Sequence, residues 1–357
     1  MLSGVQFRQI VSGERKGALA AMARGILGLL EYPYRWTVEW RNARFDDRRA
    51  KSVEVNWQVI SVGNLTVGGT GKTPFVAWVA AWLRKRGVKV AIVSRGYGSR
   101  HGEPNDEARE LATRLPDVPH LQNANRVAAT KQVFEKGLGH LVILDDAFQH
   151  RRIARKLDIV LLDALEPFGY GHLLPRGLLR EPVQGLARAQ VVALSRSDAV
   201  SEARREEIRR EVERYAPQAI WVEVVHRPQQ LTSAAKKVMA IDDLKGQPIA
   251  AFCGIGNPAG FRHTLASCGL NIVSFLEFPD HCAYAEPDLD RLRAWLKSLP
   301  VHYAICTRKD LVKIDRPGLA DMPVLALDIC LEVTQGRKEL EKVLEGMVGK
   351  SILGTNA

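Results

Sequence analysis

A glycine-rich segment between a strand pattern and a helix pattern has the residue types of a phosphate-binding loop. Residues 63–74 read Gly-Asn-Leu-Thr-Val-Gly-Gly-Thr-Gly-Lys-Thr-Pro. Glycines let successive backbone N–H groups turn inward around phosphate oxygens, and the following helix N-terminus adds partial positive charge. Lys72 can then reach the β- and γ-phosphates, and the Thr73 hydroxyl can bind Mg²⁺. We predict a nucleoside triphosphate site formed by Thr66, Val67, Gly68, Gly69, Thr70, Gly71, Lys72 and Thr73.

The loop departs from the usual spacing G-x-x-x-x-G-K-[ST] at one position, because Thr66 stands where the first glycine is expected. Gly68 and Gly69 can supply the missing backbone freedom. A glycine-rich strand-to-helix turn with an exposed lysine is the alternative interpretation. The apolar strand pattern at 58–62 and the helix pattern from about 71 to 86 favour a phosphate loop.

Two adjacent carboxylates, Asp145 and Asp146, follow the apolar run at 141–144. A carboxylate at the end of such a strand can hold Mg²⁺ directly or through water. Neighbouring carboxylates repel each other unless a cation or hydrogen bonds offset the repulsion. We therefore predict Asp145 and Asp146, together with Thr73, as metal ligands. A solvated acidic turn is the alternative.

The chain around these motifs alternates strand and helix patterns, which is typical of parallel sheets with helices on both faces. Its 357 residues suffice for two domains. A polar, aperiodic stretch at 226–238 divides the chain. Before it, strand patterns lie at 58–62, 88–94, 141–144, 157–162, 190–195 and 219–225, and a further helix pattern lies at 123–136. After the polar stretch, strand patterns lie at 248–253, 271–277, 302–306 and 324–328, with helices at 259–268, 286–298 and about 335–347.

We predict two α/β/α sandwich domains with mostly parallel sheets, preceded by an N-terminal amphipathic helix. Residues 1–50 would form the helix and its connection, and 51–228 a P-loop domain. Residues 229–238 would be a linker, and 239–357 a second α/β domain that closes over the nucleotide and substrate cleft.

The N-terminal segment is basic and amphipathic. Its first 51 residues carry ten Lys/Arg and five Asp/Glu, so they contribute +5 of the chain's formal +11. One helical face would combine Leu19, Met22, Ala23, Ile26, Leu27 and Leu30. With Trp36 and Trp40 nearby, such a helix can lie in a lipid headgroup layer, so we predict an anionic membrane surface as a partner. Packing on its own domain is the alternative.

Composition narrows the class of protein further. Hydrophobic residues make up 46% and charged residues 25% of the chain, which excludes disorder as the main state. The five cysteines form no CxxC pair, so neither a zinc site nor a disulfide scaffold is expected. The positive charge points to an anionic partner. We expect no nucleic acid among them, because no aromatic and basic nucleic-acid motif is present. No obligate protein partner is evident.

In order along the chain, these motifs resemble those of the tetraacyldisaccharide 4′-kinase family, the lipid A kinases. The resemblance covers about 57–313 and lies in residues 63–74, 94–98, 145–150, 173–182, 252–258, 278–281 and 307–310. It implies ATP- and Mg²⁺-dependent phosphorylation of the 4′-hydroxyl of a tetraacyldisaccharide 1-phosphate, giving lipid IVA. It also implies a peripheral protein on the cytoplasmic face of the bacterial inner membrane.

The resemblance implies roles for further residues. Asp106 would be the general base, paired with His281 from the second domain. Arg180 would offset charge near the γ-phosphate, and Glu181 would lie near the metal. The sequence departs from the family where Asn105-Asp106-Glu107-Ala108 replaces Gly-Asp-Glu-Pro, and at Ala147, where Gly is usual.

Two further interpretations concern the nucleotide. The run 307–310 is loosely similar to a purine-contacting [NT]-K-x-D element shifted by one residue, which suggests a place near the base. A P-loop switch or partitioning ATPase that hydrolyses nucleotide to control a membrane partner is the alternative function. Such proteins often carry an extra lysine early in the loop, where Val67 stands here, so the kinase is favoured.

Overall fold

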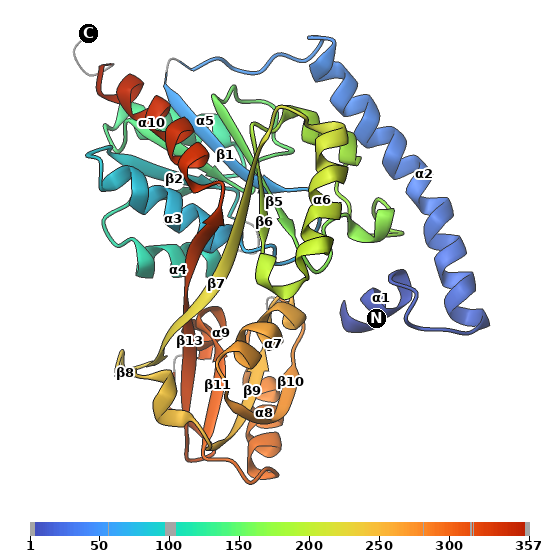
Figure 1. The fold of residues 1–357 in the computed structure, drawn as a ribbon, viewed down its shortest axis with the longest axis vertical. Coiled ribbons are helices and arrows are strands. Elements are labelled where there is room, and N and C mark those ends of the chain that lie inside the picture. The colour runs from blue at the N-terminus through green and yellow to red at the C-terminus, as the bar shows by residue number, and fades with distance from the viewer. Residues whose placement is uncertain are drawn as a thin grey trace. The chain divides into compact units, whose positions relative to one another are not determined.

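The computed structural model describes residues 4–55, 57–96, 105–280, 282–314, 316 and 318–353. The chain divides into two compact units (Figure 1). Unit 1 comprises Met1–Val225 and Val333–Ala357, and unit 2 comprises His226–Glu332. Each unit contains a mostly parallel sheet with helices, so the predicted fold class is confirmed.

Unit 1 is built on a parallel sheet with strand order β7-β6-β5-β1-β4-β2-β3. The strands are β1 (Gln58–Asn64), β2 (Val90–Ser94), β3 (His120–Gln122), β4 (Leu141–Asp145), β5 (Leu157–Asp163), β6 (Val191–Ser195) and β7 (Ile220–Ser233). Every residue of β4, β5 and β6 is buried. That burial explains their nearly continuous apolar runs, broken within β5 by Asp158, which are typical of strands covered on both faces.

Helices follow the strands of unit 1. They are α3 (Lys72–Arg84), α4 (Asp106–Arg114), α5 (Arg126–Glu135), α6 (Glu202–Tyr215) and α10 (Arg337–Leu353), with short 3₁₀ turns η1 (Gly169–Gly171), η2 (Val183–Arg188) and η3 (Ser197–Ala199). Ala129 and Val133 place α5 in a buried cluster with Val59 and Val142.

The parallel register gathers the carboxyl ends of β1, β4 and β5 at one edge. Ligands of open α/β sheets bind at this edge.

The N-terminal segment forms α1 (Gly4–Val11) and the 29-residue helix α2 (Ala18–Asp46), which continues well beyond the predicted apolar face (Figure 1). A stripe on α2 remains between 52% and 79% exposed. This exposed apolar face consists of Leu19, Met22, Ile26, Leu29, Leu30, Trp36 and Trp40. The side chains of this face are therefore more than half exposed and are not buried against the rest of unit 1. Across the described residues, no helix combines the length and hydropathy needed to span a bilayer.

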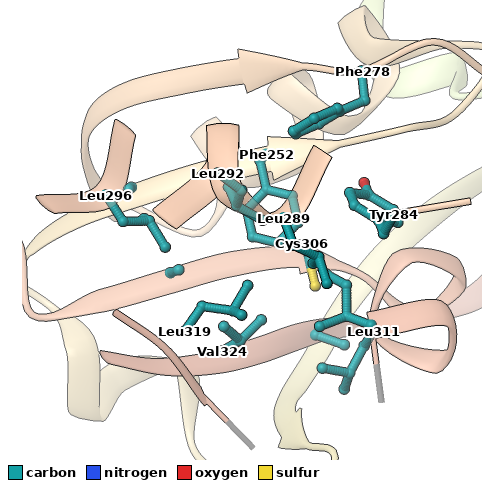
Figure 2. Close-up of a cluster of buried hydrophobic side chains, with 14 of the residues drawn as sticks. Phe252, Phe278, Tyr284, Leu289, Leu292, Leu296, Cys306, Leu311, Leu319 and Val324 are labelled. Carbon is teal, nitrogen blue, oxygen red and sulfur yellow. The ribbon is translucent and has the colours of Figure 1, made fainter. Parts of the chain in front are cut away.

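In unit 2, parallel strands follow one another in the order β10-β9-β11-β13. Its strands are β8 (Val238–Met239), β9 (Pro248–Cys253), β10 (Asn271–Glu277), β11 (Tyr303–Thr307), β12 (Gly318–Leu319) and β13 (Met322–Gln335). Its helices are η4 (Ile241–Leu244), α7 (Pro258–Ser267), α8 (Glu286–Lys297) and α9 (Arg308–Ile314). Figure 2 shows one core cluster, in which Phe252, Phe278 and Tyr284 lie beside aliphatic side chains of α8.

The division into units differs from the predicted boundaries at two places. Residues 229–238, expected as a linker, contain the end of β7 and β8. Val333–Ala357, expected in the second domain, group with unit 1. The cause is the length of β13, which is 14 residues and carries the chain back to α10. Leu340 and Leu344 of α10 are fully buried.

Candidate active site

The predicted phosphate loop joins β1 to α3, as its sequence indicates. Gly68 and Gly71 adopt φ values of 120° and 83°. Such values are costly for residues with a Cβ, so these two positions need glycine. Gly63 is required for a different reason, because a Cβ there would lie 2.6 Å from Cβ of Phe148. The loop glycines therefore permit the close backbone turn that a phosphate cradle requires.

Side chains from three strand ends hold this loop in place. Asn64 Nδ2 donates to Thr70 Oγ1 at 3.1 Å. Arg196, just after β6, donates from Nη2 to the Gly69 carbonyl at 2.8 Å and from Nη1 to Asp163 Oδ2 at 2.7 Å. Because Arg196 and Asp163 are both buried, their ion pair fixes the guanidinium beside the loop.

The segment 172–181 lies along the other side of the loop. Val67 N donates to the Leu178 carbonyl at 2.8 Å, and Arg180 N donates to the Leu65 carbonyl at 2.7 Å. Thr66 also forms an antiparallel bridge with Leu179. These backbone contacts bring Arg180 and Glu181 next to the phosphate loop, although more than 100 residues separate them in the sequence.

Lys72 and Arg180 share one carboxylate. Lys72 Nζ lies 3.4 Å from Asp146 Oδ1, and Arg180 Nη1 donates to Oδ1 and Oδ2 of Asp146 at 2.8 and 2.9 Å. Arg126 Nη2 donates to the Asp146 carbonyl at 2.9 Å. Burial alone would raise the pKa of Asp146, but Lys72, Arg180 and Arg126 outweigh it and hold that pKa well below its usual range. Three cations around one carboxylate leave net positive charge, which fits the phosphates of ATP.

Asp145 lies at the end of β4, in register with Val62 of β1, and is 1% exposed. Thr73, on the first turn of α3, is 4% exposed. A carboxylate and a hydroxyl are the oxygen ligands that Mg²⁺ prefers. Within the described ranges, no group of three His, Cys, Asp or Glu side chains is arranged as a metal site.

Glu181, predicted near the metal, is fully buried and engaged on both carboxylate oxygens. Gln149 Nε2 donates to its Oε1 at 2.9 Å. Arg188 Nη2 and Asn42 Nδ2 donate to its Oε2 at 2.8 and 3.2 Å. Gln149 Nε2 also donates to the Asn64 carbonyl at 2.8 Å, at the start of the phosphate loop. Glu181 thus joins α2 to the loop through side-chain hydrogen bonds.

Asp106, the predicted base, is the first residue of α4. Asn105 caps this helix, since its Oδ1 accepts from Ala108 N at 3.0 Å. Gln122 of β3 fixes Asn105 from two sides: its Nε2 donates to Asn105 Oδ1 at 2.6 Å, and its Oε1 accepts from Asn105 N at 3.1 Å. Asn105, which stands where the family usually has glycine, therefore supplies the N-cap of α4.

The other predicted positions lie in unit 2. His281, predicted to pair with Asp106, lies outside the described residues. Asp310, from the run 307–310, is fully buried and accepts from Gly254 N at 2.9 Å, Tyr284 Oη at 2.8 Å and Thr307 Oγ1 at 2.6 Å. Donors of unit 2 itself occupy this carboxylate, so Asp310 has a structural explanation that needs no nucleotide.

Several residues of the site were not predicted from the sequence, among them Arg126, Gln149 and Arg196. Each contacts the site through a strand end or a helix start that the sheet order brings close. A signal existed for Gln149, which belongs to the run 145–150, and for Arg196, which follows an apolar strand pattern. For Arg126, a basic residue at a helix start, nothing local indicated a role.

The chain is similar to known proteins over most of its length. The family model for tetraacyldisaccharide-1-P 4′-kinase matches residues 23–348. The chain is 38% identical over 327 residues to the tetraacyldisaccharide 4′-kinase of Anaeromyxobacter dehalogenans strain 2CP-C, covering 86% of this chain and 85% of that protein. It is 33% identical to the enzyme of that name from Halothermothrix orenii, covering 87% and 89%.

A solved structure is also similar. The crystal structure of LpxK from Aquifex aeolicus in complex with ATP matches with a TM-score of 0.71 and 27% identity, covering 91% of this chain and 99% of that one. The match extends over both units, so the likeness is not confined to the phosphate loop. The chain belongs to the tetraacyldisaccharide 4′-kinase family.

Proposed function

We propose that the chain transfers the γ-phosphate of ATP to the 4′-hydroxyl of a tetraacyldisaccharide 1-phosphate at a membrane surface, using the residues around the phosphate loop. Membership of the family makes the chain an ATP-dependent kinase of lipid A biosynthesis, with ATP and Mg²⁺ as cofactors. The observation that best supports the residue roles is the cluster of Lys72, Asp146 and Arg180 beside a glycine-rich loop.

In this proposal the chain positions the phosphates and offsets their charge. The loop amides and Lys72 bind the β- and γ-phosphates, and the Arg180 guanidinium stabilises the charge that spreads over the transferred group. Asp146 is the counter-ion that holds both cations in place before nucleotide binds. Thr73 and Asp145 would hold Mg²⁺, which neutralises phosphate charge when bound. Asp146 and Glu181 remain predicted metal ligands, although Arg180 pairs with the carboxylate of Asp146 and Arg188 with that of Glu181.

The acceptor hydroxyl must lose a proton as it attacks the γ-phosphate, so a nearby base assists the reaction. We assign this role to Asp106, with His281 as the group that orients it and shares the proton. The support for Asp106 is its match to the family motif and its fixed place at the start of α4, capped by Asn105. His281 is proposed on the motif alone.

The same proposal places the chain on the cytoplasmic face of the inner membrane as a peripheral protein. The exposed apolar face of α2 carries two tryptophans, and the first 51 residues carry a net charge of +5. Apolar side chains that enter the headgroup region and basic residues that attract anionic lipid together give peripheral binding. The phosphorylated lipid acceptor lies in that same surface. The proposal includes neither nucleic acid nor an obligate protein partner.

The test is incubation with γ-labelled ATP, Mg²⁺ and detergent-solubilised tetraacyldisaccharide 1-phosphate. Labelled bisphosphorylated lipid is expected from the wild type, and almost none from Lys72→Ala. Lys85→Ala, an exposed lysine at the far end of α3, is the matched control and should retain activity. Release of all label to water, with none in lipid, would instead support a nucleotide-hydrolysing switch and overturn the proposal.

A further inference from the structure

We infer that α2 positions the phosphate site: its polar face holds the backbone of residues 172–181, so that Arg180 meets the transferred phosphate in a fixed geometry. The inference rests on the proposed function, because it concerns how the Arg180 side chain is placed for turnover. It adds a second role to a helix whose opposite face is exposed and apolar. Tyr34 and Glu31 are its main positioning residues.

Tyr34 makes the most direct contact. Its hydroxyl donates to the Arg180 carbonyl at 3.0 Å, across 146 positions of sequence. Its ring packs against the buried cluster that contains Leu65, Phe148 and Leu179, at the base of the phosphate loop. The Arg180 backbone is thereby held from two sides, since Arg180 N donates to Leu65 O. The guanidinium on this backbone is the group that meets Asp146.

Glu31 holds the beginning of the same segment. It is 6% exposed, and its Oε1 accepts from Leu173 N at 3.0 Å, while its Oε2 lies 2.9 Å from His172 Nδ1. Arg35, one turn later on α2, pairs with Oε1 at 2.8 Å. A buried carboxylate is costly without such partners. The contact with segment 172–181 explains the presence of a buried carboxylate on a helix whose other face is exposed and apolar.

Asn42 gives a third contact, two turns beyond Tyr34. Its Nδ2 donates to Glu181 Oε2, and Glu181 is linked through Gln149 to the Asn64 carbonyl. Glu31, Tyr34 and Asn42 therefore contact the beginning and the end of one segment from one helix. All three polar contacts are directed at the segment that carries Arg180.

The experiment measures kcat and KM for ATP with detergent-solubilised acceptor, so that membrane binding does not enter. Tyr34→Phe removes one hydroxyl and should lower kcat about fivefold, as expected for one hydrogen bond, with KM for ATP changed less than about twofold. Tyr32→Phe is the matched control, because this tyrosine lies on the same helix and is 71% exposed. Glu31→Gln should preserve most activity and Glu31→Leu should not, because only Gln keeps an acceptor for Leu173 N.

A double-mutant cycle separates positioning from a general structural effect. If Tyr34 acts through Arg180, adding Tyr34→Phe to Arg180→Ala should lower kcat little further. The variants with Arg180→Ala are assayed at higher enzyme concentration. Vesicle binding should be the same for Tyr34→Phe and the wild type. Both results together would support the inference.

Other results would overturn it, and they are distinguishable. Wild-type kcat for Tyr34→Phe, or a fall matched by Tyr32→Phe, rejects the inference while the proposed function stands. A lower melting temperature with unchanged kcat also rejects it, because Tyr34 would then serve stability alone. Equal fivefold losses in the wild-type and Arg180→Ala backgrounds show that Tyr34 does not act through Arg180. Wild-type kcat for Arg180→Ala would remove the proposed role of Arg180, and the inference with it.

Discussion

Replacing Asp146 by asparagine tests whether this residue is a counter-ion for Lys72 and Arg180 or a metal ligand. Asp146 has a φ of 50°, a region that asparagine also tolerates, so the backbone should be retained. The substitution keeps the size of the side chain and removes its charge. Lys72 and Arg180 would then lie close together without the carboxylate they share.

The expected loss of stability follows from the contacts. A hydrogen bond to a charged group contributes about 1.5–3 kcal/mol, and the Asp146 side chain is 32% exposed, so we expect a loss of about 2 kcal/mol. For a domain of this size, that is a fall in Tm of about 4–8 °C. The folded pKa of Asp146 is lowered, so its stabilisation is complete above the unfolded pKa of about 3.9 and is lost only in strong acid. The difference in Tm should therefore be constant between pH 6 and 9.

Nucleotide binding should change in the opposite direction. In the wild type, the phosphates must compete with Asp146 for the two cations. Without that carboxylate, ATP in metal-free buffer should bind up to about tenfold more tightly, a gain of about 1.4 kcal/mol. Turnover should fall, because Lys72 and Arg180 lose the group that fixes them.

Calorimetric titration with ATP, in EDTA and in Mg²⁺, provides the assay, and Asp145→Asn is the matched control. We expect Asp146→Asn to retain the increase in affinity that Mg²⁺ gives, and Asp145→Asn to lose it. Weaker metal-free binding by Asp146→Asn would refute the counter-ion role. Loss of the Mg²⁺ effect in Asp146→Asn alone would assign the metal to Asp146.

Three further changes test other parts of the site. Asp106→Ala should lower turnover at least about 10²-fold and leave ATP affinity unchanged; near-normal turnover would exclude Asp106 as the base. Trp36→Ala should weaken sedimentation with anionic vesicles about fivefold or more, without altering Tm; unchanged sedimentation would argue against the exposed apolar face as the membrane contact. Burial lowers the pKa of His120 to about 4, so the folded protein binds fewer protons than the unfolded chain between pH 4 and about 6.5. Stability should fall by up to about 3 kcal/mol as pH drops through that window, and His120→Gln should reduce the slope of Tm against pH.

The central sheet was largely predictable because its strands are buried on both faces. The run 141–144 is apolar throughout and the run 157–162 is interrupted only by Asp158, and the two runs coincide with β4 and β5. Helix α6 was not identified, because only Ile208 and Val212 of its 14 residues are buried and ten of the other twelve are charged. Helix α4 was also absent from the predicted elements, since its first turn, which begins at Asp106, is polar.

The site was predictable where a short motif carries it and not where the fold assembles it. Lys72 and Thr73 begin α3 and Asp145 ends β4, so their positions follow from local pattern. Arg196 reaches Gly69 only because β5 lies between β1 and β6, an order that no local spacing encodes. The contact of Tyr34 with Arg180 depends on the path of a 29-residue helix relative to a loop 146 positions away.

The charge of the chain has two separate locations, and they should respond differently to salt. The N-terminal basic residues lie mostly on an exposed helix, where a Debye length of about 8 Å at physiological ionic strength screens their attraction to lipid. Lys72 is only 10% exposed, and partly buried charges are screened much less. Raising the salt concentration should therefore increase KM for acceptor presented in anionic vesicles more than KM for ATP. If both constants rose in parallel, the N-terminal charge could not be acting mainly at the membrane surface.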